Sequence, residues 1–119
     1  MLVADDQEDV RGLLSLLLQL EGHDVATAVD GADAVAQATE HPPDAIILDV
    51  MMPRVDGLTA LRRLRAAPLT AKVPVLLLSG KTTALDVDAG ISAGADGYLA
   101  KPFEPEELLA AVAEMTHSA

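Results

Sequence analysis

The chain has 119 residues and half of them are apolar, so it is long enough for one domain with a hydrophobic core and leaves no room for a second. Its 19 acidic residues against 8 lysines and arginines give a formal net charge of −11, which argues against a surface that binds nucleic acid or an anionic membrane. The absence of cysteine excludes disulfides, thiolate nucleophiles and cysteine-ligated zinc sites.

The amino-terminal residues do not follow the pattern of a secretory signal. No basic segment precedes an apolar run. No apolar stretch approaches the roughly 18 residues that a membrane span needs. We therefore expect a cytoplasmic protein that contacts neither a membrane nor nucleic acid directly.

A short first strand and a leucine-rich helix open the chain. Residues 2–4 favour a strand, and apolar residues then recur at helical spacing until Gly22, a natural helix stop. The apolar stripe of this helix consists of Val10, Leu13, Leu14, Leu17 and Leu20. Leu16 and Leu18 lie off the stripe, which leaves open whether they form a contact surface or widen the packed face.

Two further strands lie on either side of a second helix. Residues 24–28 are predicted as a strand, and Asp30-Gly31 turns the chain into a helix that ends before Pro42-Pro43. Residues 45–48 form a continuous apolar run that closes at Asp49. Such a run favours a strand that is buried on both faces.

The third and fourth helices lie on either side of another apolar strand. Asp56 is placed to cap the third helix, and residues 73–78 are predicted as a strand. In the third helix, Leu58, Leu61 and Leu64 share one face, and Arg62, Arg63 and Arg65 share the other. Thr82 or Thr83 is expected to cap the fourth helix, which Gly90 weakens.

The last strand is predicted at residues 97–100, and Pro105 stands near the first turn of a final helix. That helix carries Leu108, Leu109, Val112 and Met115 at helical spacing. Strands that alternate with helices and are buried on both faces predict an α/β fold, in which helices cover both faces of a parallel sheet. Right-handed crossovers restrict it to doubly wound forms, but the pattern does not give the strand order.

Polar side chains follow several of the predicted strands at their carboxyl ends. Asp5 and Asp6 follow the first strand, Asp49 the third, Ser79 the fourth and Lys101 the fifth. Each alone is typical of a turn, a helix cap or a solvated charge. Together they are expected to converge on one edge of the sheet, where doubly wound proteins bind their ligands.

The chemistry of this set indicates a cation site. Carboxylates that lie close together repel one another, and a divalent cation relieves the repulsion. Magnesium suits an all-oxygen site, and His23, His41 and His117 fall in turn or terminal positions away from it. With the metal bound, a carboxylate can attack phosphorus, an ammonium can offset charge on the transferring oxygens, and a hydroxyl can bond the product.

Four segments resemble bacterial two-component response regulator receiver domains of the CheY-like type. They are Asp5-Asp6, residues 46–57 (IILDVMMPRVDG), Ser79-Gly80 and residues 94–103 (GADGYLAKPF). The resemblance covers essentially the whole chain, residues 1–119, as a single domain. It implies a three-layer, flavodoxin-like (βα)5 fold with a five-stranded parallel sheet in the order 2-1-3-4-5.

The resemblance also implies a role for each site residue. Asp49 would accept a phosphoryl group from the phosphohistidine of a sensor histidine kinase or a phosphotransfer protein. Asp49 would also ligate Mg²⁺, or Mn²⁺ in its place, together with Asp6 directly, Asp5 through water and the backbone carbonyl of Met51. Such a chain is a signalling switch and no true enzyme, since it catalyses only its own phosphorylation and dephosphorylation.

Further residues would carry the switch. Lys101, joined to Pro102 by a cis peptide bond, would pair with the phosphoryl group. Ser79 would move to bind that group, and Tyr98 would swing inward behind it, changing the face made by the fourth helix, fifth strand and fifth helix. Gly80 would leave the phosphoryl site open.

The resemblance implies partners as well. They are a downstream output domain or target protein and, on phosphorylation, a second copy of the chain. Gly97 in place of the usual acid, and alanines at 110, 111 and 113 in place of basic residues, argue against the charge-paired dimer face of the winged-helix transcription factors. The chain is expected to be either a stand-alone receiver or part of a longer protein.

Two other functions compete with a phosphorylated receiver. A phosphatase of the haloacid dehalogenase type needs a second aspartate two residues after the nucleophile, where Met51 stands. A pseudo-receiver that only binds partners usually lacks an acid, the lysine or the hydroxyl, and all of these are present here.

Overall fold

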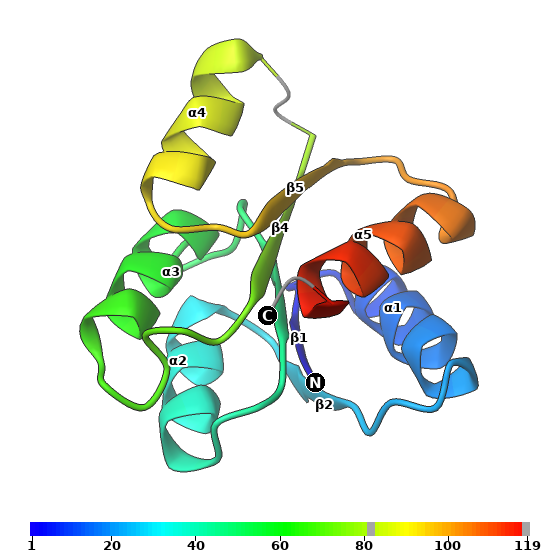
Figure 1. Ribbon diagram of the computed structural model, residues 1–119, viewed down its shortest axis with the longest axis horizontal. Coiled ribbons are helices and arrows are strands. Elements are labelled where there is room, and N and C mark those ends of the chain that lie inside the picture. Colours follow the sequence, from blue (N-terminus) through cyan, green and yellow to red (C-terminus); the bar gives the residue numbers. More distant parts are fainter. Residues whose placement is uncertain (81–82, 118–119) are drawn as a thin grey trace.

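The computed structural model describes residues 1–80 and 83–117, and within them a five-stranded parallel sheet lies between two layers of helices (Figure 1). The strands are β1 (Leu2–Ala4), β2 (Ala26–Ala28), β3 (Ile46–Asp49), β4 (Val75–Ser79) and β5 (Gly97–Ala100). The helices are α1 (Glu8–Leu20), α2 (Gly31–Glu40), α3 (Gly57–Ala66), α4 (Ala84–Ser92) and α5 (Pro105–His117). The strand order is β2-β1-β3-β4-β5, so the predicted doubly wound, flavodoxin-like topology is confirmed.

The helices divide between the two faces of the sheet. Figure 1 shows α1 and α5 on one side, and α2, α3 and α4 on the other. Alternate residues of the central strands face opposite layers, so Ile46 and Leu48 pack with α2 and α3 while Ile47 packs with α1 and α5. This alternation explains why β3 and β4 are continuous apolar runs: both of their faces are buried.

The register of the strands aligns their carboxyl ends. Ala4 pairs with Leu48, Asp49 with Leu78, and Ser79 with Ala100. The residues that end or follow β1, β3, β4 and β5 therefore meet at one edge of the sheet. This is the edge at which the polar side chains were expected to converge.

Side-chain caps begin the three helices on one face of the sheet. Asp30 accepts from the backbone N–H of Asp33 at α2, and Asp56 accepts from that of Thr59 at α3. Thr83 accepts from the N–H of Asp86 at α4, while Thr82 lies outside the described residues. The capping aspartate at 56 and a threonine cap on the fourth helix were both predicted from sequence.

Three predicted strands differ from the observed ones at their amino ends. β2 starts at residue 26 instead of 24, β3 at residue 46 instead of 45, and β4 at residue 75 instead of 73. The proline at 74 has no N–H to contribute to the sheet, although its carbonyl accepts from Ile46. β3 and β4 extend one residue further than predicted, to Asp49 and Ser79.

The buried face of α1 is rotated from the predicted stripe. Leu14 and Leu18 are fully buried, whereas Leu13 and Leu20 are 46% and 75% exposed. Leu18 therefore belongs to the packed face, and Leu16, 53% exposed, does not. Seven leucines or valines crowd this helix, so periodicity fits more than one face, and contact with β1 and α5 selects the row at i, i+4 and i+8.

Arg65 does not share the solvent face of its two neighbouring arginines. Its side chain is 19% exposed and donates to the carbonyls of Gly94 and Val73 and to the carboxylate of Asp96. Carbonyls at the turns before β4 and β5 need donors, and the flat, five-donor guanidinium reaches several of them at once. Arg65 thereby ties the carboxyl end of α3 to the turn that follows α4.

Gly90, which was expected to weaken α4, also allows this helix to pack closely against the sheet. A Cβ built on it would lie 2.9 Å from Cδ1 of Leu77 and 3.0 Å from Cδ2 of Tyr98. The helix can therefore approach the sheet and the Tyr98 ring closely at this residue only because the side chain is missing. Among residues 1–80 and 83–117, no helix has both the length and the apolar character to cross a membrane.

Candidate phosphoacceptor and metal site

Three carboxylates meet at the carboxyl edge of the sheet. Oxygens of Asp5, Asp6 and Asp49 all lie within 4.8 Å of one another. Asp5 and Asp49 are buried, with 0% and 3% of their surface exposed, whereas Asp6 is exposed. The convergence predicted for these acids is therefore present, and only one of them faces solvent freely.

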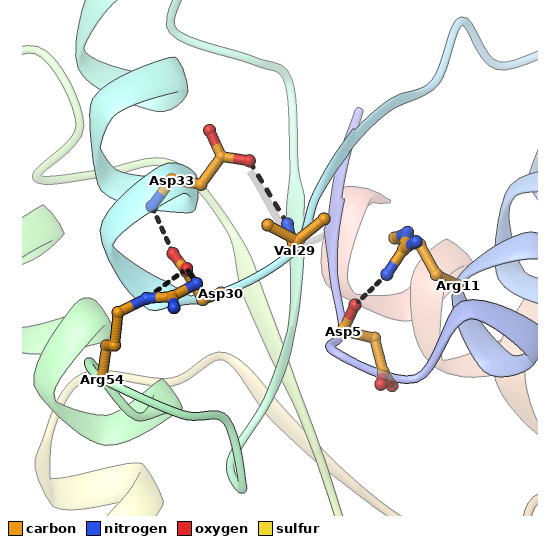
Figure 2. A network of polar contacts seen from close by, with 6 residues as sticks. All are labelled: Asp5, Arg11, Val29, Asp30, Asp33 and Arg54. Atoms are coloured by element: carbon orange, nitrogen blue, oxygen red, sulfur yellow. Dashed lines mark hydrogen bonds and ion pairs between the residues drawn. The ribbon is translucent and has the colours of Figure 1, made fainter.

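The turn after β1 fixes Asp5 through its neighbours. The Asp5 side chain accepts from the N–H of Gln7 at 2.9 Å. Its backbone carbonyl accepts from Nη1 of Arg11, 2.8 Å away, as Figure 2 shows. The sequence analysis did not identify Gln7 and Arg11. The bond from the Gln7 N–H could have been expected, because an aspartate often accepts from the backbone N–H two residues later in a turn. No sequence signal predicts the bond from Arg11 in the first helix.

Lys101 reaches two of the carboxylates from the end of β5. Its Nζ lies 3.0 Å from Oδ2 of Asp5 and 3.2 Å from Oδ2 of Asp49. Its backbone N–H donates to the carbonyl of Ser79, and its peptide bond to Pro102 is cis, as the resemblance implied. The ammonium thus bridges the outer strand and the central carboxylates.

Burial and charge act against each other on this set. Burial, together with the charge of Asp5, raises the pKa of Asp49, although Lys101 opposes the rise. Burial also acts to lower the pKa of Lys101, but its hydrogen bond to Asp5 and the charge of Asp49 outweigh burial, so that pKa is raised. Lys101 therefore does not cancel the combined effect of burial and of the Asp5 charge on Asp49.

A depression of about 250 Å³ opens beside the carboxylates. It is lined by Asp6, Gln7, Asp49, Met51, Gly80 and Lys101. A methyl group at Gly80 would meet no atom within 4 Å, so this residue borders open space. A small ligand in the depression could therefore reach Asp49 and the exposed Asp6.

The donor set of the site fits a hard divalent cation. It offers carboxylate oxygens, and the Met51 backbone lies at its edge, with the N–H of Met51 3.3 Å from Oδ1 of Asp49. Magnesium and manganese take such oxygen ligands. A bound cation would also reduce the repulsion between the neighbouring carboxylates. The residues present therefore fit the metal that the sequence predicted.

Ser79 and Tyr98 lie on β4 and β5, the two strands that follow β3 in the sheet. Ser79 is fully buried at the end of β4, one residue beyond the pairing partner of Asp49. Tyr98 is half-buried in β5, and its ring lies against Gly90 of α4. The structure thus places Ser79 on the strand next to Asp49 and the Tyr98 ring beside α4.

Comparison with known proteins agrees with this geometry. The family model of the response regulator receiver domain matches residues 1–113. The transcriptional regulatory protein PrrA of Mycobacterium tuberculosis is 50% identical over 112 residues, which cover 94% of this chain and 47% of that protein. The chain thus spans about half the length of the curated relatives it matches.

Solved structures agree as well. The chemotaxis protein CheY4 of Vibrio cholerae superposes with a TM-score of 0.91 at 36% identity, over 96% of this chain and 95% of that one. The receiver domain of the sensor histidine kinase PA1611 from Pseudomonas aeruginosa, which has a magnesium ion coordinated in its active site cleft, gives 0.90 at 31% identity, covering 98% and 96%. The chain belongs to the response regulator receiver domain family of two-component systems.

Proposed function

We propose that the chain is a phosphoacceptor that takes a phosphoryl group onto Asp49 from a phosphohistidine of a sensor histidine kinase or a phosphotransfer protein. The observation that carries the proposal is the placement of Asp49. It is a buried carboxylate 3.2 Å from the ammonium of Lys101, beside two further acids and an open depression.

The transfer needs little from the protein beyond position and charge. A carboxylate oxygen of Asp49 forms the new bond to phosphorus while the phosphorus–nitrogen bond of the phosphohistidine breaks, and the imidazole keeps the electron pair. Lys101 offsets negative charge on the transferring oxygens. A bound divalent cation would supply the rest of that compensation.

The metal would be held by the residues that border the depression. Asp6 is exposed there and suits direct contact with Mg²⁺ or Mn²⁺. Both Asp5 oxygens already accept hydrogen bonds, from Gln7 and Lys101, which supports contact through water. Asp49 and the backbone carbonyl of Met51 would complete the protein's share of the ligands.

Phosphorylation would act on the face formed by α4, β5 and α5. Ser79 would donate its hydroxyl to a phosphoryl oxygen, and Tyr98 would follow inward. The relatives support an output domain as the partner, since PrrA is a transcriptional regulatory protein about twice as long as the match. An output domain that controls transcription would then read the switch, with target proteins or a second phosphorylated copy as other readers.

Intact mass tests the acceptor directly. Incubation with a small phosphodonor and Mg²⁺ should add one phosphoryl group to the parent protein and none to Asp49→Asn. The control Asp44→Asn removes an exposed acid just before β3 and should label like the parent. Labelling of Asp49→Asn to the parent's extent would refute the assignment, while an unlabelled parent that ignores Mg²⁺ would identify a pseudo-receiver.

A further inference from the structure

An ion pair fastens the segment between β3 and α3 to the amino end of α2. Nε of Arg54 donates to Oδ2 of Asp30 at 2.9 Å, and Nη2 of the same guanidinium donates to the same oxygen. Figure 2 shows the guanidinium lying over the Asp30 carboxylate. The Asp30 side chain is 6% exposed and that of Arg54 is 70% exposed, so the fixed partner is the acid.

Asp30 is itself held in place by the helix it begins. Its Oδ1 accepts from the N–H of Asp33 at 2.8 Å, and the Asp33 carboxylate accepts from the N–H of Val29 (Figure 2). The bond from Asp33 and then the guanidinium of Arg54 lower the pKa of Asp30, so it stays ionised. The acid thus offers Arg54 a charged and rigid anchor.

The backbone closes the same contact. The N–H of Gly31 donates to the carbonyl of Val55 at 3.0 Å, and a Cβ at Gly31 would lie 2.1 Å from that oxygen. Arg54 has a φ of 64°, a left-handed conformation that most side chains avoid. Arg54 and Val55 therefore both contact the start of α2, and such contacts stabilise the unfavourable backbone conformation of Arg54.

The other end of the same segment borders the candidate metal site. The N–H of Val50 donates to the carbonyl of Leu78 in β4, and Met51 lines the depression beside Asp49. Only Met52 and Pro53 separate Met51 from Arg54. Met51 therefore lies between a residue that is bonded to the sheet and a segment that is fastened to the start of α2.

We propose that Asp30 and Arg54 are positioning residues for divalent cation binding, because their ion pair fixes the segment that offers the Met51 carbonyl to the ion. The inference rests on the proposed function, which places the cation at Asp5, Asp6 and Asp49. Neither residue touches the ion. A ligand held in place beforehand costs less to order on binding, so the affinity depends on the pair.

Binding energies are reciprocal, so the coupling also runs from the metal to α2. If the Asp30–Arg54 pair favours the ion, the ion must favour the pair to the same extent. A purely structural role, in which the pair only secures the start of α2, predicts no such link. Magnesium should therefore shift the Gly31 amide resonance in the parent protein.

Magnesium titration by calorimetry, with thermal unfolding in chelator, tests the proposal. Arg54→Asn removes the guanidinium but tolerates the positive φ, and Asp30→Asn removes the charge but can still cap α2. Each should weaken Mg²⁺ binding by about tenfold. The double variant should lose no more than either single one, since both break the same contact.

Two further variants complete the experiment. Arg62→Asn makes the same chemical change at an exposed position of α3 and should bind Mg²⁺ like the parent. Arg54→Lys keeps a cation near Asp30 and should recover part of the lost affinity. In Arg54→Asn, Mg²⁺ should no longer shift the Gly31 amide.

The failures are distinguishable. A parent that binds Mg²⁺, together with Asp30 and Arg54 variants that bind it equally well, would overturn the positioning role and leave the metal site standing. A parent that binds no Mg²⁺ would overturn the site and this inference with it. If a variant does not fold, Mg²⁺ binding to the parent without any shift at Gly31 would still refute the coupling.

Discussion

At the scale of single residues, Asp49 shows how this fold places a carboxylate in an unfavourable setting. It is buried, and Asp5 lies beside it with the same charge. Lys101 is the counter-charge, but it is shared between the two acids. A raised pKa at Asp49 means that the folded protein resists ionising a group that the unfolded chain ionises readily.

The Asp49→Asn substitution should therefore stabilise the metal-free protein at neutral pH. The folded-state pKa of Asp49 lies above the unfolded value near 3.8, so its cost is absent below that value and grows as the pH rises through the folded-state pKa. In chelator, the midpoint of urea unfolding should be higher for Asp49→Asn than for the parent at pH 7, and the two should converge in acid.

Two comparisons check the cause. Asp44→Asn, which removes an exposed acid, should not diverge from the parent with pH in this way. Saturating Mg²⁺ should reverse the order of Asp49→Asn and the parent, because a ligand that binds the native state stabilises it. A lower midpoint for Asp49→Asn in chelator would mean that its bond to Lys101 outweighs burial and repulsion.

At the scale of elements, α1 shows where periodicity stops being informative. Leucine occurs on most sides of this helix, so several apolar stripes fit its sequence equally well. The sheet and α5 select the face that includes Leu14 and Leu18 and leave Leu20 in solvent. The selected face is the one whose side chains pack against those of the sheet and α5.

A matched pair of substitutions measures that selection. Leu18→Ala should lower the free energy of unfolding by about 2–5 kcal/mol, because it leaves a cavity against a fully buried cluster. Leu20→Ala makes the same chemical change at a 75% exposed position and should stay within about 0.5 kcal/mol of the parent. Urea unfolding gives both values, and equal losses would contradict the observed rotation of α1.

At the scale of the whole molecule, two residues lie between the candidate site and the face formed by α4, β5 and α5. Ser79 ends the strand next to Asp49, and Tyr98 lies on the adjacent strand with its ring against Gly90. Of the residues in α4, only Gly90 is buried. A helix secured by so little apolar contact is the one that a local change can move most easily.

Removing the Ser79 hydroxyl should uncouple phosphorylation from this face. Beryllofluoride, added to the Mg²⁺-loaded protein as a phosphoryl mimic, should shift amide resonances of α4 and β5 far more than those of α2. Ser79→Ala should still bind the mimic at Asp49, but the shifts around Tyr98 should be blunted. Equal shifts in Ser79→Ala and the parent would show that the hydroxyl does not carry the signal.

The energies involved limit how complete the switch can be. Reversing a two-state population from 1:99 to 99:1 takes about 5.5 kcal/mol of differential binding. A hydrogen bond to a charged group contributes about 1.5–3 kcal/mol. One such bond from Ser79 falls short, so we expect the active conformation to be partly populated before phosphorylation.

Much of this protein was determined by its sequence alone. Continuous apolar runs at β3 and β4, alternating with helical periods, predicted a sheet covered on both faces, because buried strands need apolar residues on both sides. The acids after β1, the acid at the end of β3 and the lysine after β5 predicted a common site, because parallel strands bring their carboxyl ends to one edge. The strand order and the assigned roles came from the family resemblance.

Contacts between distant segments were decided only by the tertiary structure. Arg65 looks like its exposed neighbours in the sequence, yet it bonds to turns about 30 residues later, whose carbonyls no local pattern announces. Arg54 bonds to Asp30, which stands 24 residues earlier in the chain. The sequence does not distinguish Arg54 from Arg62, another exposed arginine. Helical and strand periods record which way a side chain faces along its own element, and the partner it meets depends on how the elements pack.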